Sequence, residues 1–317
     1  MSLRKRWSCC GSPVGPACLG TLVCSDRVMR LPVEIRFLLG CLAATCLLAE
    51  TAAAQSNPIT STSRLWLEWN STPNVQWAPV SVDQEAEPDR TLNVFKLQPV
   101  ATFRLNEDWT LLTRTIFRFV SAPTARPEVG LTALGEFALL GWDQTHRTGL
   151  SDVSPTAFFV PNLGPHWTIG LGPSLVIPVG DLPTNSGKLS LGPAVLGYYH
   201  QGPWTVGARM RNVWSVAGDP ARAEVHRFIA QPLIRYKFSK KWYLTSSPII
   251  SIDWVHPDGD GWTVPVGGGI GTAFRLANQP MQISLEAYYN AVKPSIAGER
   301  LLGDWTIRTQ VMMLFPR

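Results

Sequence analysis

The sequence predicts an all-β fold, a transmembrane antiparallel up-and-down β-barrel of about twelve strands. Hydrophobic residues make up 45% of the chain and charged residues only 16%, although about a quarter is usual in soluble proteins. No stretch after residue 50 approaches the roughly 18 uncharged apolar residues that a membrane helix needs. Apolar and polar residues instead alternate in segments of about 10 to 15 residues, which is typical of strands with one face in lipid.

An N-terminal signal peptide is expected before the barrel. Arg30 and Arg36 precede an apolar run over 37–49, and small residues lead up to Ala54 and Gln55. Basic, apolar and small residues in this order are typical of a secretory signal that is too short to span a membrane. We therefore expect export and cleavage near Ala54-Gln55. The alternatives are a buried helix of the mature fold or a lipoprotein.

The chain is predicted to have three parts: 1–27, an upstream artefact or disordered leader; 28–54, the signal peptide; and 55–317, the barrel. All six cysteines precede residue 55, and a lipoprotein would be anchored through Cys41. Six of the 28 basic and three of the 23 acidic residues also precede residue 55, which leaves 22 and 20 and lowers the net charge from +5 to +2. Because the basicity lies mostly in the leader, no nucleic-acid partner is expected.

Period-two alternation is clearest at 281–293. The odd positions from Met281 to Ala291 are mostly apolar, and the even positions from Gln282 to Asn290 are mostly polar. The same pattern gives twelve strand candidates along the chain. They are 62–70, 91–105, 109–121, 149–161, 166–179, 187–200, 203–217, 222–238, 241–255, 262–276, 281–293 and 303–315.

The links between these candidates alternate in length. Short links such as 106–108 and 201–202 alternate with longer ones such as 122–148. Outer-membrane barrels alternate short periplasmic turns with longer external loops, and an even strand number places both termini in the periplasm. The apolar stretch 131–142 fits no alternating template, so it is predicted to lie in the long loop 122–148.

Tryptophans stand at the ends of the predicted strands. Trp204 and Trp214 are ten residues apart, which spans about 25 Å at ~3.3 Å per residue and a tilt of ~40°. Amphipathic rings prefer the two membrane interfaces, so two aromatic girdles are predicted. The girdle residues are Trp109, Trp167, Trp204 and Trp242 after short turns, and Trp214, Trp254, Trp262 and Trp305 at the long-loop ends.

Charged residues of the strands are predicted to face the lumen, because a charge in hydrocarbon costs about 2 to 4 kcal/mol at the midplane. The lumen-lining candidates are Arg104, Arg114, Arg118, Arg209, Arg211, Arg227, Arg235, Asp253, Glu286 and Arg308. An arginine-rich lumen favours anions. In the alternative interpretation these arginines pair with loop carboxylates and fill a closed interior.

Several motifs resemble a known family. They include Leu105-Asn106-Glu107-Asp108-Trp109, Gly170-Leu171-Gly172-Pro173, Gln201-Gly202-Pro203-Trp204 and Trp262-Thr263-Val264-Pro265-Val266. They resemble the bacterial outer-membrane proteins of the meta-pathway of phenol degradation, some of which are mislabelled neuromedin U. The resemblance covers most of 91–317 and implies a barrel that takes up small, often hydrophobic, molecules. The chain differs in its longer 122–148 stretch and in its ending Phe315-Pro316-Arg317.

No catalytic, cofactor or metal site is predicted. The five histidines do not have a common metal-ligand spacing, and neither a serine elbow nor a cysteine nucleophile is found. We expect a porin-like, non-enzymatic transport protein of a Gram-negative outer membrane, a narrow channel for small aromatic, hydrophobic or anionic molecules. Its expected partners are outer-membrane lipids, a small-molecule solute and the barrel-insertion machinery. The alternatives are a non-conducting structural or adhesive barrel that acts through its loops and an outer-membrane hydrolase.

Overall fold

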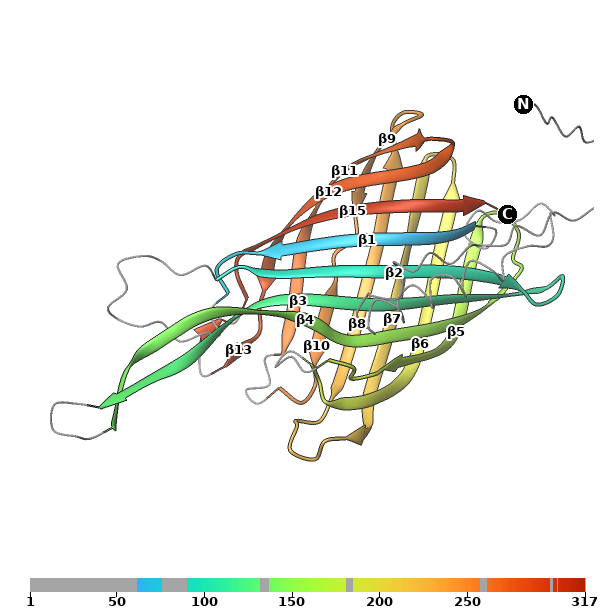
Figure 1. The fold of residues 1–317 in the computed structure, drawn as a ribbon. Coiled ribbons are helices and arrows are strands. Elements are labelled where there is room, and N and C mark those ends of the chain that lie inside the picture. Colours follow the sequence, from blue (N-terminus) through green and yellow to red (C-terminus); the bar gives the residue numbers. More distant parts are fainter. Residues whose placement is uncertain are drawn as a thin grey trace, which may run out of the picture. The chain divides into compact units, whose positions relative to one another are not determined.

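The described residues form a closed antiparallel β-barrel (Figure 1). The computed structural model describes residues 62–75, 90–131, 137–180, 185–256, 261–296, 299–300 and 302–316. The leader and signal peptide expected at 1–54 lie outside these residues. Among the described residues, no helix is long and apolar enough to cross a membrane.

Thirteen strands form the barrel sheet, and two of them share one position in the wall, so the barrel has twelve positions. A separate hairpin of two short strands, β13 and β14 with two residues each, lies between β12 and β15 in the sequence. The predicted twelve-stranded barrel is therefore confirmed. The strands are β1 (Thr62–Thr72), β2 (Leu92–Arg104), β3 (Trp109–Leu131), β4 (Phe137–Pro161), β5 (Trp167–Val176), β6 (Lys188–Gln201), β7 (Trp204–Gly218), β8 (His226–Lys237), β9 (Trp242–Ser246), β10 (Ile250–Asp253), β11 (Trp262–Leu276), β12 (Gln279–Val292), β13 (Ser295–Ile296), β14 (Glu299–Arg300) and β15 (Trp305–Pro316).

The first and last strands close the barrel. β1 pairs with β15 from Thr62 opposite Pro316 to Ser71 opposite Ile307, and its other edge pairs with β2. Every other barrel strand also has a neighbour on each side. Closure satisfies the backbone N–H and C=O groups that lipid cannot hydrogen-bond, which is the condition for a β-structure to cross a membrane.

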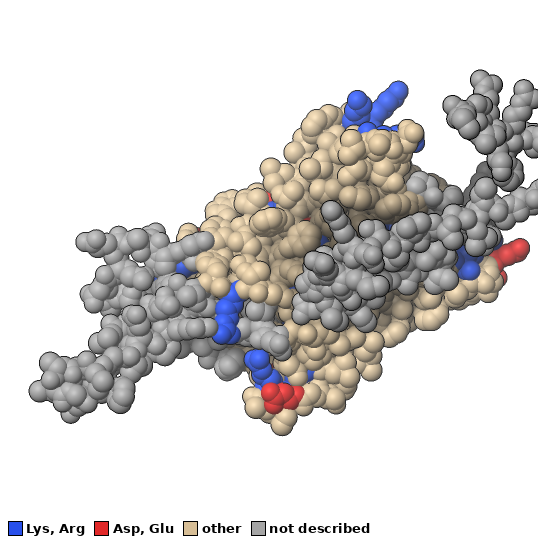
Figure 2. All heavy atoms as spheres, in the orientation of Figure 1, with Lys and Arg blue, Asp and Glu red and all other residues tan. Residues whose placement is uncertain are grey.

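Alternation sorts the side chains of each strand between lipid and lumen. In β12 the side chains of Ile283, Leu285 and Tyr289 are exposed on the outer face, whereas Glu286 and Tyr288 are buried. The face drawn in Figure 2 follows the same rule, since charged side chains gather toward the ends of the barrel and the visible wall between them is uncharged. The faces predicted for this segment are thus confirmed.

The prediction that 131–142 belongs to a loop is wrong for Leu131 and for 137–142, the described residues of this stretch. β3 and β4 have 23 and 25 residues, and they stay paired up to Leu131 opposite Phe137. Figure 1 shows this hairpin projecting past the neighbouring strands at the long-loop end. Strands outside the lipid band need no uniformly apolar face, because only lipid imposes one. The segment is therefore extended without the period-two signature.

The prediction of a single strand at 241–255 is also wrong, because this segment is divided into β9 and β10. Proline has no N–H to donate to a ladder, and Pro248 lies in the gap. The backbone of the preceding Ser247 is bound by side chains instead. Its N–H donates to the Tyr288 hydroxyl at 2.8 Å, and its carbonyl accepts from Arg308 Nη1 at 2.7 Å. The interruption thus brings backbone groups into the polar interior.

We expect a charge on the lipid face to cost most at mid-strand. Leu285→Arg places a cation at the middle of β12, where Leu285 is 56% exposed and pairs with Ile270 and Thr309. The free energy of unfolding should fall by about 2 to 4 kcal/mol. The matched control, Leu276→Arg at the turn end of β11, should cost roughly 0 to 1 kcal/mol. Denaturant unfolding in lipid vesicles measures both, and equal losses would contradict this orientation of the wall.

Candidate functional site

Two cavities lie inside the barrel. The turn-side cavity, near the short turns, has a volume of about 230 Å³ and is lined by residues that include Arg64, Trp66 and Lys237. The loop-side cavity, toward the long loops, has a volume of about 750 Å³ and is lined by residues that include Arg118 and Asp253.

Four residues line both cavities and mark the place where these meet. They are Arg114, Phe158, Arg209 and Gln231. Arg209 Nη2 donates a hydrogen bond to Gln231 Oε1 at 2.6 Å. Two arginines, one ring and one amide therefore form the boundary that a solute would have to pass.

Glu68 on β1 organises one wall of the lumen. Its carboxylate is only 3% exposed and lies 2.6 Å from Lys96 Nζ on β2. It also accepts hydrogen bonds from the amides of Asn70 at 2.8 Å, Gln98 at 3.3 Å and Gln310 at 3.1 Å. One carboxylate thus connects β1, β2 and β15.

Arg308 extends this network to the interrupted strand. Its Nε lies 3.8 Å from Glu68 Oε1 and its Nη1 lies 3.5 Å from Glu286 Oε2. Glu286 in turn accepts hydrogen bonds from Ser247 Oγ at 3.1 Å and from the Tyr288 hydroxyl. The two acids and the two bases, Lys96 and Arg308, balance each other in charge. We call these four residues and their amide and hydroxyl partners the buried network.

Four other arginines are bound differently. Arg114 donates to Gln98 and Arg209 to Gln231, while Arg211 Nη1 donates to a serine hydroxyl at 3.3 Å and Arg235 Nη1 to a glutamine at 3.1 Å. Within the described part of the chain, none of the four forms an ion pair. Their charges are solvated by neutral dipoles, so the lumen retains a positive potential.

The loop-side cavity carries its own carboxylates. Arg227 and Asp253 form an ion pair of 3.2 Å at the mouth of this cavity. Glu224, in the loop between β7 and β8, lies 3.0 Å from Lys188 Nζ. A hydrogen bond from Ser215 and this ion pair lower the pKa of the Glu224 carboxyl. The positive potential is therefore partly compensated at this end.

The ten lumen candidates occupy five kinds of place. Contact between any of them and a solute stays a prediction. The structure places Arg114 and Arg209 in both cavities, Arg235 in the turn-side cavity, Arg118, Arg211, Arg227 and Asp253 in the loop-side cavity, Glu286 and Arg308 in the buried network, and Arg104 at a turn, where its Nε donates to the Asn106 carbonyl.

Sequence reasoning missed Glu68 and Trp66, which are central to the lumen. The signal was present, because Arg64, Trp66, Glu68 and Asn70 alternate with outward residues such as Trp69. In this segment Trp66 breaks the simple separation of polar from apolar positions. Because the pattern assigns polar residues to the lumen, it does not predict that an aromatic residue such as Trp66 faces inward.

The eight girdle tryptophans all lie on the outer surface, with 36% to 52% of each side chain exposed. Neighbouring rings pack against several of them, as Tyr199 does on Trp167 at 4.7 Å and Tyr236 on Trp204 at 4.6 Å between ring centroids. Trp69 is also exposed, at 55%, and was not among the eight. Anchoring of these rings at the membrane interfaces stays a prediction.

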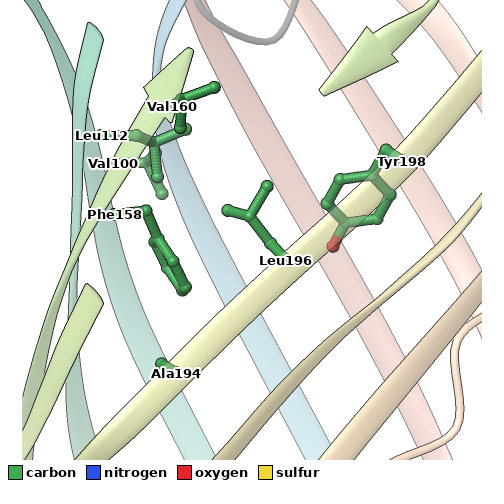
Figure 3. Packing of buried hydrophobic residues seen from close by; sticks show 7 residues of the cluster. All are labelled: Val100, Leu112, Phe158, Val160, Ala194, Leu196 and Tyr198. Atoms are coloured by element: carbon green, nitrogen blue, oxygen red, sulfur yellow. The ribbon is translucent and has the colours of Figure 1, made fainter. Parts of the chain in front are cut away.

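The turn-side cavity has one apolar wall. Figure 3 shows the cluster that forms it, contributed by β2, β3, β4 and β6 and turned toward the barrel interior. Leu112, Phe158 and Leu196 are each at most 5% exposed, and Leu233 packs against the cluster. This wall faces a cavity that also contains arginines, so the cavity is amphipathic.

A known protein family matches this chain. The family of the "MetA-pathway of phenol degradation" matches residues 82–245, more than half of the chain. The chain belongs to this family. The match includes β2 to β8 and ends within β9, whereas the motifs predicted a resemblance up to the C-terminus.

Solved structures show the fold of this family member. An outer membrane channel from Pseudomonas putida F1 superposes with a TM-score of 0.54 at 15% identity, covering 84% of this chain and 100% of that one. The NanC porin, with a TM-score of 0.45, and the CymD monoaromatic hydrocarbon channel, with 0.44, are each 10% identical. They cover 78% and 83% of this chain, and 98% and 89% of their own. No curated protein matches the chain. The chain thus has the fold of an outer-membrane β-barrel.

We expect removal of the Glu68 carboxylate to destabilise the barrel through Lys96. Glu68→Leu leaves the buried Lys96 ammonium without its partner, and roughly 3 kcal/mol of the unfolding free energy should be lost. Adding Lys96→Met should restore most of it, because no uncompensated charge then remains. Asp253→Asn, in the partly exposed ion pair with Arg227, should change the stability little. Chemical unfolding in vesicles measures all three, and a double variant no better than the single one would refute this role.

Proposed function

We propose that this protein is a narrow outer-membrane channel for small molecules, with a preference for anions. The observation that carries this proposal is the set of four arginines, Arg114, Arg209, Arg211 and Arg235, whose hydrogen-bond acceptors are neutral. Rings of Arg or Lys bias a pore toward anions. A filled interior with each arginine on a carboxylate would have no such excess.

The boundary between the cavities supports a narrow path. Arg114 and Arg209 line both cavities together with Phe158, so a solute passing through meets two guanidinium groups beside one aromatic ring. The volumes of about 230 and 750 Å³ limit the solute to a small molecule. The chain belongs to a family named after the degradation of phenol, and phenol is a molecule of this size.

A second candidate function has one observation in its favour. The β3–β4 hairpin projects past its neighbours at the long-loop end (Figure 1). Such a projection suits a barrel that binds a partner through its external surface and conducts nothing. The interior charge excess has no role in that alternative, so the channel is preferred.

Single-channel recording tests the channel. The protein, purified from outer membranes and placed in planar bilayers, should show stable conductance, and a salt gradient should give a reversal potential of the sign for anions. Arg209→Glu and Arg211→Glu should each reduce the anion preference, because each reverses a lumen charge. Arg104→Glu, at a turn outside both cavities, is the matched control and should change little. A folded barrel that conducts nothing would leave only the second candidate.

Export through a cleaved signal peptide is part of the same proposal. The protein from native outer membranes should begin at or near Gln55, because the basic, apolar and small segments before it have the order of a signal. Terminal sequencing of the purified protein measures this. Finding residues 1–27 intact would contradict both the cleavage and the assignment of that stretch. We also propose that the exported chain is inserted by the barrel-insertion machinery. Depletion of that machinery should therefore remove the folded form of the protein from the outer membrane.

A further inference from the structure

We propose that the turn-side cavity is a binding site for small aromatic carboxylates, with the ring on the apolar wall and the carboxylate on Arg114, Arg209 and Trp66. This inference rests on the proposed channel function and names its solute class. It follows from the charge of the cavity lining, from buried donors without acceptors, and from the shape of the apolar wall.

The described lining of the turn-side cavity contains no aspartate or glutamate. It contains four arginines, Arg64, Arg114, Arg209 and Arg235, together with Lys237. The loop-side cavity differs, since its lining includes four carboxylates. Because the carboxylates of the buried network are already engaged by Lys96 and Arg308, the smaller cavity is the place where an external anion gains most.

Buried nitrogen donors around this cavity lack acceptors within the described residues. They are the Nε atoms of Arg114, Arg209 and Arg235 and the indole Nε1 of Trp66. Each of these groups donates and none accepts. A buried donor without an acceptor is unfavourable, and a charged acceptor gives the stronger hydrogen bond. The lining thus requires acceptors and excludes further donors.

The position of Trp66 brings these donors together. The Cζ atoms of Arg209 and Arg114 lie 5.1 and 5.9 Å from the centroid of its ring. Two guanidinium groups therefore lie close to the Trp66 ring, on the wall contributed by β1. Nearby, Arg235 lies 4.4 Å from the ring centroid of Tyr243, so further aromatic surface carries a cation within the same cavity.

The apolar wall decides against a simple inorganic anion. Leu112, Phe158 and Leu196 present buried hydrocarbon to the cavity, and a hydrated ion gains nothing from it. A cavity of roughly 150 Å³ lined by such side chains binds benzene. The turn-side cavity, with about 230 Å³, has room for one aromatic ring and a carboxylate. A neutral hydrocarbon would fill the wall but leave the donors without acceptors.

Calorimetric titration of the detergent-solubilised protein from outer membranes tests the site with three probes. Benzoate has both the ring and the charge. Benzyl alcohol has the ring with a neutral hydroxyl group, and acetate has the carboxylate without a ring. Benzoate should bind at least about tenfold more tightly than either of the others. Arg209→Gln and Trp66→Leu should each weaken benzoate binding about tenfold or more. The matched controls are Arg104→Gln, at the turn, and Trp69→Leu, on the outer face of the same strand, and both should leave benzoate affinity unchanged.

Heat-modifiable mobility on gels checks that each variant is folded, and Arg235→Gln replaces any variant that is not. Benzyl alcohol binding as tightly as benzoate, or benzoate affinity unaffected by the lumen variants, would overturn the site. The binding assay needs no conductance, so the two proposals fail separately. Benzoate binding without conductance would reject the channel and keep the site, whereas conductance without benzoate binding would reject only the site.

Discussion

The ion pair between Glu68 and Lys96 determines how charge is distributed inside this barrel. A barrel in lipid must turn its charged side chains inward, and an inward charge that finds no partner is costly. Glu68 meets this constraint for β1 and β2 through Lys96, at 2.6 Å, and for β15 through the amide of Gln310 and, at 3.8 Å, Arg308. The strands that close the barrel are therefore joined by side chains as well as by backbone hydrogen bonds.

The buried network also affects the arginines beside it in the lumen. Glu68 and Glu286 are bound to Lys96 and Arg308, so neither carboxylate is left for Arg114 or Arg209. Those arginines bind amide oxygens instead. Neutral acceptors stabilise a guanidinium without cancelling its charge. The stability of the buried network and the positive potential beside it thus arise from the same few acids.

Alternation alone predicted most of the barrel, because lipid imposes it on every membrane-facing strand. The faces around Leu285 follow from it, and so does the strand number. It could not predict features that lipid does not control. The paired ends of β3 and β4, at Leu131 and from Phe137, lie in a hairpin that projects past the neighbouring strands. The interruption at Ser247 depends on side chains far away in sequence, and Trp66 faces inward although it is aromatic. The ion pairs of Glu68 likewise depend on which strands become neighbours.

The two cavities in series also suggest how such a site can conduct. A pore must bind its solute strongly enough to admit it and weakly enough to release it. The loop-side cavity has carboxylates such as Asp253 and Glu224, which weaken its hold on an anion. The turn-side cavity has none in its described lining. Arg114 and Arg209 belong to both cavities, so an anion leaving one arginine-lined space is still within reach of the next. In the proposed channel, the positive potential would therefore increase toward the short turns, and an anion would move inward without crossing a neutral gap.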